Sequence, residues 1–259
     1  MCQIDYVYND YMSKGEIIKF LFWKTLGNFL LLFAIFGIIG TFGPSLYYQA
    51  VFRVGQLRGI KYTLAPQLAQ PQQGPSELGK LVKKYWGRDV ATNQTPSLFG
   101  DILSRHTEKI LIPPNTNFSI VIPKIGAAEA VTANVDPSNK DEYLRVLQHS
   151  IAHARGTAYP GINGTTYLFA HSADNFWDIG RYNAVFYLLK DLKDGDEVYV
   201  FFQDKRFDYV VYDTKIVDAD DTEYLDPALG QGERLILQTC WPPGTDWKRT
   251  LVFAKPKAS

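Results

Sequence analysis

The sequence predicts an all-β domain, an eight-stranded β-barrel with a few short helices, preceded by an N-terminal transmembrane helix and a stem. Three observations predict it. No charged residue occurs between Lys24 and Arg53, a stretch rich in Pro, Gln, Gly and Ser follows, and short apolar runs bounded by turn residues then recur to the end. These runs give about eight strands in roughly 150 residues, a length typical of one domain.

The composition limits the classes of partner. The chain has 259 residues, of which 46% are hydrophobic, so there is enough apolar material for a sizeable core. Lys plus Arg (27) equals Asp plus Glu (27), which leaves no basic surplus for nucleic acid. The two cysteines, Cys2 and Cys240, lie on opposite sides of the hydrophobic segment, so we expect Cys240 to be a free thiol.

The uncharged segment predicts a transmembrane helix over residues 25–52, after a tail of residues 1–24. Its length approaches the roughly 30 Å of a bilayer's hydrocarbon core. A cleavable signal peptide is the rival interpretation, but the apolar region is too long. Ala50 also has Tyr48, not a small residue, two places before it. Lysines and arginines flank the segment equally, so charge alone does not orient it.

Residues 53–108 are expected to form a stem or linker that acts as a spacer from the bilayer. Their Pro, Gln, Gly and Ser content is typical of a segment that cannot bury enough apolar surface to fold alone. Within it, 77–86 has apolar residues at helical spacing and predicts one short helix.

Residues 109–259 are expected to form the barrel. Helical spacing predicts one helix over 137–154 between strands. The turn Gln-Asp-Lys-Arg predicts a hairpin. The expected strands are residues 109–112, the run 118–131, 166–171, 197–202, 207–217, 234–239 and 249–255.

The last two strands bring a thiol and a cation together. Cys240 ends one strand, Arg249 begins the next, and two prolines and a glycine make the turn between them. Fixed positive charge favours a thiolate, although a lone cysteine is more often a small buried hydrophobe. His171, at the end of another strand, is able to accept the thiol's proton and deliver it to a leaving amine. A guanidinium is able to hold an oxyanion, so these are the parts of an acyl-transfer site.

Three strings resemble, in order and spacing, the sortase family of membrane-anchored cysteine transpeptidases. They are HARGTAYPGINGTTYLFAHS (153–172), LKDGDEVYV (192–200) and LILQTCWPPGTDWKRTLVFA (235–254), and the resemblance covers about residues 109–256. It implies a sortase-type barrel with Cys240 as nucleophile, His171 as general acid and base, and Arg249 positioning substrate and supporting the oxyanion. Thr239 matches the Thr-Cys pair of the family and is expected to shape the substrate groove.

The resemblance also implies a location and partners. The N-terminus is expected in the cytoplasm and the catalytic domain outside it, on a single-pass membrane protein. The expected substrates are surface proteins or pilins with a C-terminal sorting signal of the LPxTG type. The signal would be cleaved through a thioester and passed to an amine of a cell-wall precursor or a pilin lysine. Ala170 replaces the glycine usual before the histidine, and the subclass, housekeeping or pilus-assembling, stays open.

Two other functions compete. A cysteine hydrolase of the same fold would pass the acyl group to water, a difference that the sequence does not reveal. A non-catalytic, membrane-tethered barrel that only binds peptides is the other, and the presence of His171, Cys240 and Arg249 together argues against it.

The remaining candidates are binding residues. Trp241 is expected to contact substrate beside the nucleophile. No cofactor is expected to be required, although some family members bind calcium in the loop before the cysteine strand. His149 and His153 lack a third ligand, so we expect no zinc site there. The acidic residues of that loop are Asp218, Asp220, Asp221 and Glu223.

Overall fold

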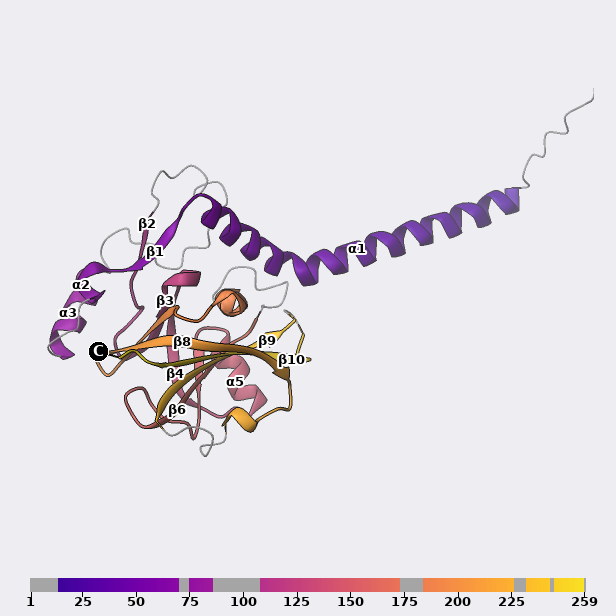
Figure 1. Cartoon of the computed structure of the whole chain (residues 1–259). Coiled ribbons are helices and arrows are strands. Elements are labelled where there is room, and N and C mark those ends of the chain that lie inside the picture. Colours follow the sequence, from indigo (N-terminus) through magenta and orange to yellow (C-terminus); the bar gives the residue numbers. More distant parts are fainter. Residues whose placement is uncertain are drawn as a thin grey trace, which may run out of the picture. The chain divides into compact units, whose positions relative to one another are not determined.

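A computed structural model of the chain describes residues 14–69, 75–85, 108–172, 184–225, 232–242 and 245–258. The chain divides into two compact units, residues 1–43 and 44–259. The first unit holds most of one helix, and the second holds a closed barrel with the elements packed on it (Figure 1).

Helix α1 (Lys14–Leu57) contains the apolar segment. Its window Gly15–Gly40 has 26 residues, a mean hydropathy of 1.8 and no share buried inside the protein. At about 1.5 Å per residue this window exceeds the hydrocarbon thickness of a bilayer, so its length and composition fit a membrane span. The helix extends past both ends of the predicted span 25–52. In the second unit its last turns contact the barrel, where Phe52 is buried in the main apolar cluster.

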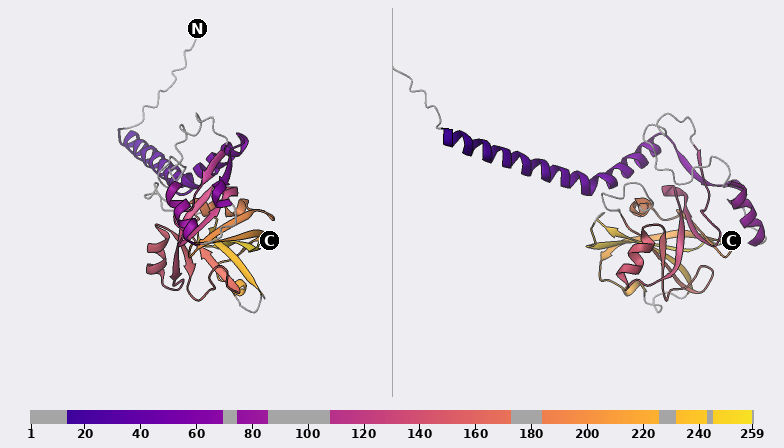
Figure 2. Two further views of the ribbon diagram at one scale, coloured as in Figure 1. Left: turned by 90° about the vertical axis from the view of Figure 1, so that its left-hand side faces the viewer. Right: turned by 180° about the vertical axis from the view of Figure 1, so that it is seen from behind.

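Eight strands close the barrel in the order β10-β8-β7-β3-β4-β5-β6-β9. Figure 2 shows the ribbon from two further sides. Most neighbours are antiparallel, but β4–β5 and β6–β9 are parallel pairs. The main core fills the barrel with buried aliphatic and aromatic side chains. The strands are β3 (Phe118–Ile122), β4 (Ala127–Val135), β5 (Ile151–Ala154), β6 (Gly164–Phe169), β7 (Glu197–Phe202), β8 (Lys205–Asp218), β9 (Glu233–Trp241) and β10 (Lys248–Pro256).

Local sequence explains the turns. Gln203 and Asp204 form the two-residue turn between β7 and β8, and both have positive φ (49° and 58°), as a tight hairpin with the twist of its strands requires. Between β3 and β4 lies η1 (Pro123–Ile125), which ends at Gly126 with φ 69°. A Cβ on Gly126 would lie 2.9 Å from the ring of Tyr62, so only glycine admits this contact. The other short helices are α5 (Lys140–Leu147), η2 (Ala184–Asp191) and η3 (Glu223–Leu225).

About eight strands were predicted, but two of the segments that form them differ from the prediction. The helix predicted over 137–154 ends at Leu147, and Ile151–Ala154 forms β5 instead. All four residues of β5 are buried, so they lack the alternation that identifies a strand. The predicted strand 109–112 corresponds to β2 (Glu108–Leu111), which lies outside the barrel and pairs in parallel with β1 (Lys61–Leu64).

Part of the predicted stem packs on the barrel. β1, α2 (Pro66–Ala69) and α3 (Pro75–Tyr85) contribute to a second apolar cluster with barrel residues Val121, Ala128 and Phe201. The predicted short helix is present as α3. These residues fold because the barrel supplies the apolar surface that they lack by themselves. They are therefore part of the second unit, while residues 70–74 and 86–107 of the predicted stem lie outside the described residues.

Candidate active site

Cys240 lies near the end of β9, between two other strands of the barrel. On one side, β10 pairs Arg249 directly with Cys240. Directly opposed residues of adjacent strands project to the same side of a sheet, so the thiol and the guanidinium share one face. The predicted approach of these two residues is therefore present.

His171 lies on the other side of β9 from Arg249, at the level of Cys240 along the strand. β6 runs parallel to β9, and their last registered pair is Phe169 with Gln238. Beyond it, the Ala170 backbone N–H donates to the Gln238 carbonyl (3.1 Å), and the Thr239 hydroxyl donates to the Ala170 carbonyl (3.2 Å). The strands thus remain adjacent until His171, which follows at the level of Cys240. Three candidate residues come from three neighbouring strands at one end of the barrel.

The charges of the thiol and the imidazole depend mainly on burial. Burial raises the pKa of the Cys240 thiol, while the Arg249 guanidinium acts to lower it and Asp246 to raise it. Burial also lowers the pKa of His171. Both shifts favour neutral groups, so a thiol and a neutral imidazole are the main resting form at neutral pH. A thiolate then forms only when a neighbouring base, for which His171 is the candidate, takes the thiol proton.

Backbone carbonyls hold the Arg249 side chain. Its Nη1 donates to the carbonyl oxygens of Asp246 (2.9 Å), just before β10, and of Lys248 (3.1 Å), the first residue of β10. These two carbonyls therefore fix the direction of the guanidinium. The arrangement suits a cation that is kept in place before an oxyanion forms, because no reorganisation is then required during the reaction.

Thr239 and Trp241 flank the nucleophile on the other face of β9. Thr239 is only 2% exposed and its hydroxyl bonds to β6, so it ties the histidine strand to the cysteine strand. The role of Thr239 in shaping the substrate groove stays a prediction. Trp241 is half-buried against the main core, and the Lys190 ammonium lies 5.2 Å from the centroid of its ring.

Tyr167 and Gln238 are two residues of this face that the sequence analysis did not identify. The Tyr167 hydroxyl donates to Gln238 Oε1. Burial raises the pKa of Tyr167, and the charges of Arg249 and Cys240 act on the same hydroxyl, so this pair lies near the catalytic groups. Gln238 is two positions before Cys240 and therefore on the same face of the strand. Counting back by two from the nucleophile would have found it.

The acidic residues considered for calcium are dispersed. Asp218 forms an ion pair with Lys248 (3.3 Å), and Asp221 accepts from the Glu223 backbone N–H (3.2 Å). Asp220 is exposed to solvent. Within the described ranges, no group of three or more His, Cys, Asp or Glu residues is arranged to hold a metal ion.

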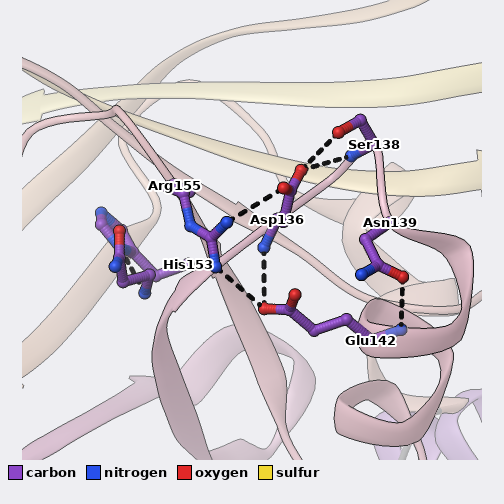
Figure 3. A network of polar contacts seen from close by, with 7 residues as sticks. Asp136, Ser138, Asn139, Glu142, His153 and Arg155 are labelled. Atoms are coloured by element: carbon purple, nitrogen blue, oxygen red, sulfur yellow. Dashed lines mark hydrogen bonds and ion pairs between the residues drawn. The ribbon is translucent and has the colours of Figure 1, made fainter.

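His153 lies on β5, next to the histidine strand, and has structural contacts. Its Nδ1 accepts from the Asn134 backbone N–H (3.2 Å), so the ring proton is on Nε2, 3.1 Å from the Ala158 carbonyl oxygen. Two positions on, Arg155 joins Asp136 and Glu142 at 3.0 and 3.3 Å, which ties β5 to α5 (Figure 3). The ring of His153 is 1% exposed.

Comparison with known proteins gives one consistent set of relatives. The family model of the Sortase domain matches residues 120–257. Sortase D of Bacillus subtilis (strain 168) is 29% identical over 137 residues, which are 52% of this chain and 60% of that protein. The match thus spans less than two thirds of the length of this relative.

Solved structures of the same kind are also similar. The pilus-related sortase C of Group B Streptococcus is 26% identical with a TM-score of 0.45, and the match covers 55% of this chain and 68% of that one. Sortase C1 of Streptococcus suis is 25% identical with a TM-score of 0.45, and the match covers 56% of this chain and 75% of that one.

Proposed function

The chain belongs to the sortase family, and from this premise we propose that it is a cysteine transpeptidase. It cleaves an LPxTG-like sorting signal through a thioester on Cys240 and transfers the acyl group to an amine. The observation that carries the proposal is the alignment of Cys240 with Arg249 on one side and the end of the His171 strand on the other. This alignment supports acyl transfer because a nucleophile, a proton carrier and an oxyanion cation meet at one place.

The first half of the reaction forms the thioester. The Cys240 sulfur attacks the threonine carbonyl of the signal, and the thiol proton passes to His171. Arg249 stabilises the oxyanion that develops on the carbonyl oxygen. When this intermediate collapses, the peptide C–N bond breaks and His171 returns the proton to the leaving amine. The acyl group is then joined to Cys240.

The second half releases the product. An acceptor amine attacks the thioester carbonyl and gives a proton to neutral His171, while Arg249 again supports the oxyanion. The C–S bond breaks, and the sulfur recovers its proton from His171. A new amide remains. We infer that the acceptor is a cell-wall precursor or a pilin lysine, and that the donors are surface proteins or pilins with the signal.

Mass spectrometry of the full chain in detergent micelles, with LPxTG-type peptides and an amine acceptor, tests the proposal. We expect a Cys240 adduct equal to the N-terminal part of the peptide, and a product joined to the amine. Cys240→Ala should give neither. An acid product with no amide, at saturating amine, would indicate the hydrolase instead. A peptide that binds unchanged would indicate the binding barrel.

The position in the membrane is a separate proposal. The apolar window Gly15–Gly40 supports attachment to a membrane, and we propose that the barrel lies outside the cytoplasm. A membrane-impermeant maleimide applied to intact cells should modify Cys240 and not Cys2, as read by peptide mass spectrometry. Modification of Cys2 alone would show the opposite orientation, with the barrel in the cytoplasm.

We also propose that the reaction needs no cofactor. Calcium at the loop of Asp218, Asp220, Asp221 and Glu223 is the alternative. The rate of transfer should be equal with added calcium and with a chelator. A rate that rises with calcium in the wild type, but not in Asp220→Asn, would establish a calcium site there.

A further inference from the structure

The last turns of α1 contact η2 through two polar links. The Tyr187 hydroxyl donates to Gln49 Oε1 (2.7 Å), and Arg53 Nη2 lies 3.2 Å from Asp191 Oδ1. Gln49 and Arg53 are one helical turn apart, so they lie on one face of α1. Phe52, 8% exposed, packs into the main core beside them. All these residues belong to the second unit.

Lys190 continues this link toward the active site. Its Nζ donates to the Tyr187 hydroxyl (2.8 Å) and lies 4.0 Å from the centroid of the Tyr187 ring. A hydroxyl donates once and accepts on its lone pairs, so Tyr187 is able to serve Gln49 and Lys190 together. The same Nζ is 5.2 Å from the centroid of the Trp241 ring, within the range of a cation–π contact.

Trp241 is the residue after Cys240 and pairs with Lys248 at the end of the β9–β10 ladder. Lys248 is the first residue of β10, and its carbonyl is one of the two that hold Arg249. A ring held in place at Trp241 therefore bears on the strand end that orients the guanidinium. A contact at this ring bears on two of the three catalytic groups.

We propose that Lys190 is a positioning residue for the active site and is held by α1 through Tyr187. Docking of α1 on η2 thereby affects the position of Cys240 and Arg249 at the end of the β9–β10 ladder. The order of contacts is Gln49, Tyr187, Lys190 and Trp241. The membrane-anchoring helix thus influences the site through the barrel, without touching substrate. The inference rests on the proposed roles of Cys240 and Arg249, but the contacts do not depend on which peptide is transferred.

Fluorine NMR of the full chain, labelled with 5-fluorotryptophan in detergent micelles, tests the link directly. The Trp241 resonance is assigned as the one lost in Trp241→Phe. Lys190→Gln, which removes the charge, should move this resonance, and so should Tyr187→Phe, which keeps the ring and removes only the hydroxyl. Gln49→Ala tests the far end of the link in the same way. The matched control is Lys193→Met, an exposed lysine three positions from Lys190, which should leave the resonance in place.

Kinetics provide the second readout. Lys190→Gln should lower kcat/KM for peptide transfer about three- to tenfold, mainly in kcat, while Lys193→Met keeps the wild-type value. A Trp241 resonance that stays in place in both Lys190→Gln and Tyr187→Phe would overturn the proposal. If only Gln49→Ala has no effect, the coupling to α1 is overturned. The remaining tryptophan resonances report whether each variant is folded. Wild-type protein that transfers no peptide would refute the transpeptidase function and leave the resonance test intact.

Discussion

His153 lies on β5 and His171 lies just beyond the end of the neighbouring strand β6, and burial lowers the pKa of both. Their surroundings differ. Both ring nitrogens of His153 have hydrogen-bonding partners, and its ring stacks on Tyr159 with centroids 4.5 Å apart. Among the residues that the structure describes, none forms a hydrogen bond with His171. The same residue type, with a shift in the same direction, is locked at one position and free to exchange a proton at the other.

The comparison shows that a lowered histidine pKa does not by itself indicate catalysis. A proton added to His153 Nδ1 would face the Asn134 N–H and break that hydrogen bond. His171 has no such hydrogen bond to lose among the described residues. Available ring nitrogens near a nucleophile, and not the pKa shift, therefore distinguish the catalytic candidate.

The largest expected effect is at His171. His171→Gln removes the proton carrier and should lower kcat/KM for peptide transfer by about 10²- to 10⁴-fold. The unfolding temperature should change little, because the described residues make no hydrogen bond to this ring. Steady-state kinetics and thermal unfolding in micelles measure both quantities. A variant with more than a tenth of wild-type activity would exclude the role as acid and base.

Arg249→Met comes next. It should lower kcat by about 10²- to 10³-fold, as expected for the loss of an oxyanion donor. Arg249 acts to lower the pKa of the Cys240 thiol, so its removal should raise that pKa further. The pH dependence of Cys240 alkylation by iodoacetamide, followed by mass spectrometry, should therefore shift to higher pH. An unshifted curve would show that the guanidinium does not act on the thiol.

His153 should affect stability and not chemistry. Its pKa is lowered in the folded state, so below about pH 6.5 the unfolded chain binds more protons and the free energy of unfolding falls. The largest slope from one such group is about 1.4 kcal/mol per pH unit. His153→Gln should cost about 1–3 kcal/mol at pH 7.5 and flatten this dependence, while retaining transfer at low temperature.

Denaturant unfolding of both proteins at pH 7.5 and 5.5 provides the measurement. His171 contributes with the same sign, because its pKa is also lowered, so the variant should lose part of the slope and not all of it. Equal slopes in wild type and variant would contradict the assignment of His153.

The smallest effect is expected at Arg155. Its ion pairs with Asp136 and Glu142 are partly exposed, with 48% of the arginine side chain accessible. Exposed pairs typically contribute about 0–1 kcal/mol, so Arg155→Met should reduce the free energy of unfolding by less than about 1 kcal/mol. High salt should lower wild-type stability by a similar amount. A loss as large as that of His153→Gln would show that this network is a main stabiliser of β5.

The sequence was sufficient for the parts that have local signals. β9 and β10 have apolar sequences, and the strings around His171 and Cys240 carried the family resemblance. Residues 243–244 of the predicted turn between these strands lie outside the described residues. β5 was missed because a short strand buried on every side has no period. The pairing of β1 with β2 was missed because parallel partners far apart in the chain leave no local trace.

The contacts of Lys190 and Tyr167 were not predictable for a related reason. Each depends on a side chain from one element reaching a residue of another, such as Tyr167 to Gln238, 71 positions apart. The spacing of residues within one segment does not predict a contact between residues so far apart in the sequence. The docking of Phe52 in the barrel core is similar, since its apolar neighbours in sequence indicated only a membrane span.

The position of β9 between β6 and β10 determines when the proposed catalytic residues meet. Thr239 and Ala170 meet across 69 positions of chain, so Cys240, the proposed nucleophile, is synthesised long after His171, its proposed base. It joins that base only when the last two strands close the barrel. In a nascent or partly folded chain, Cys240 therefore lies apart from the two residues proposed to act with it. Only the completed barrel brings the three together.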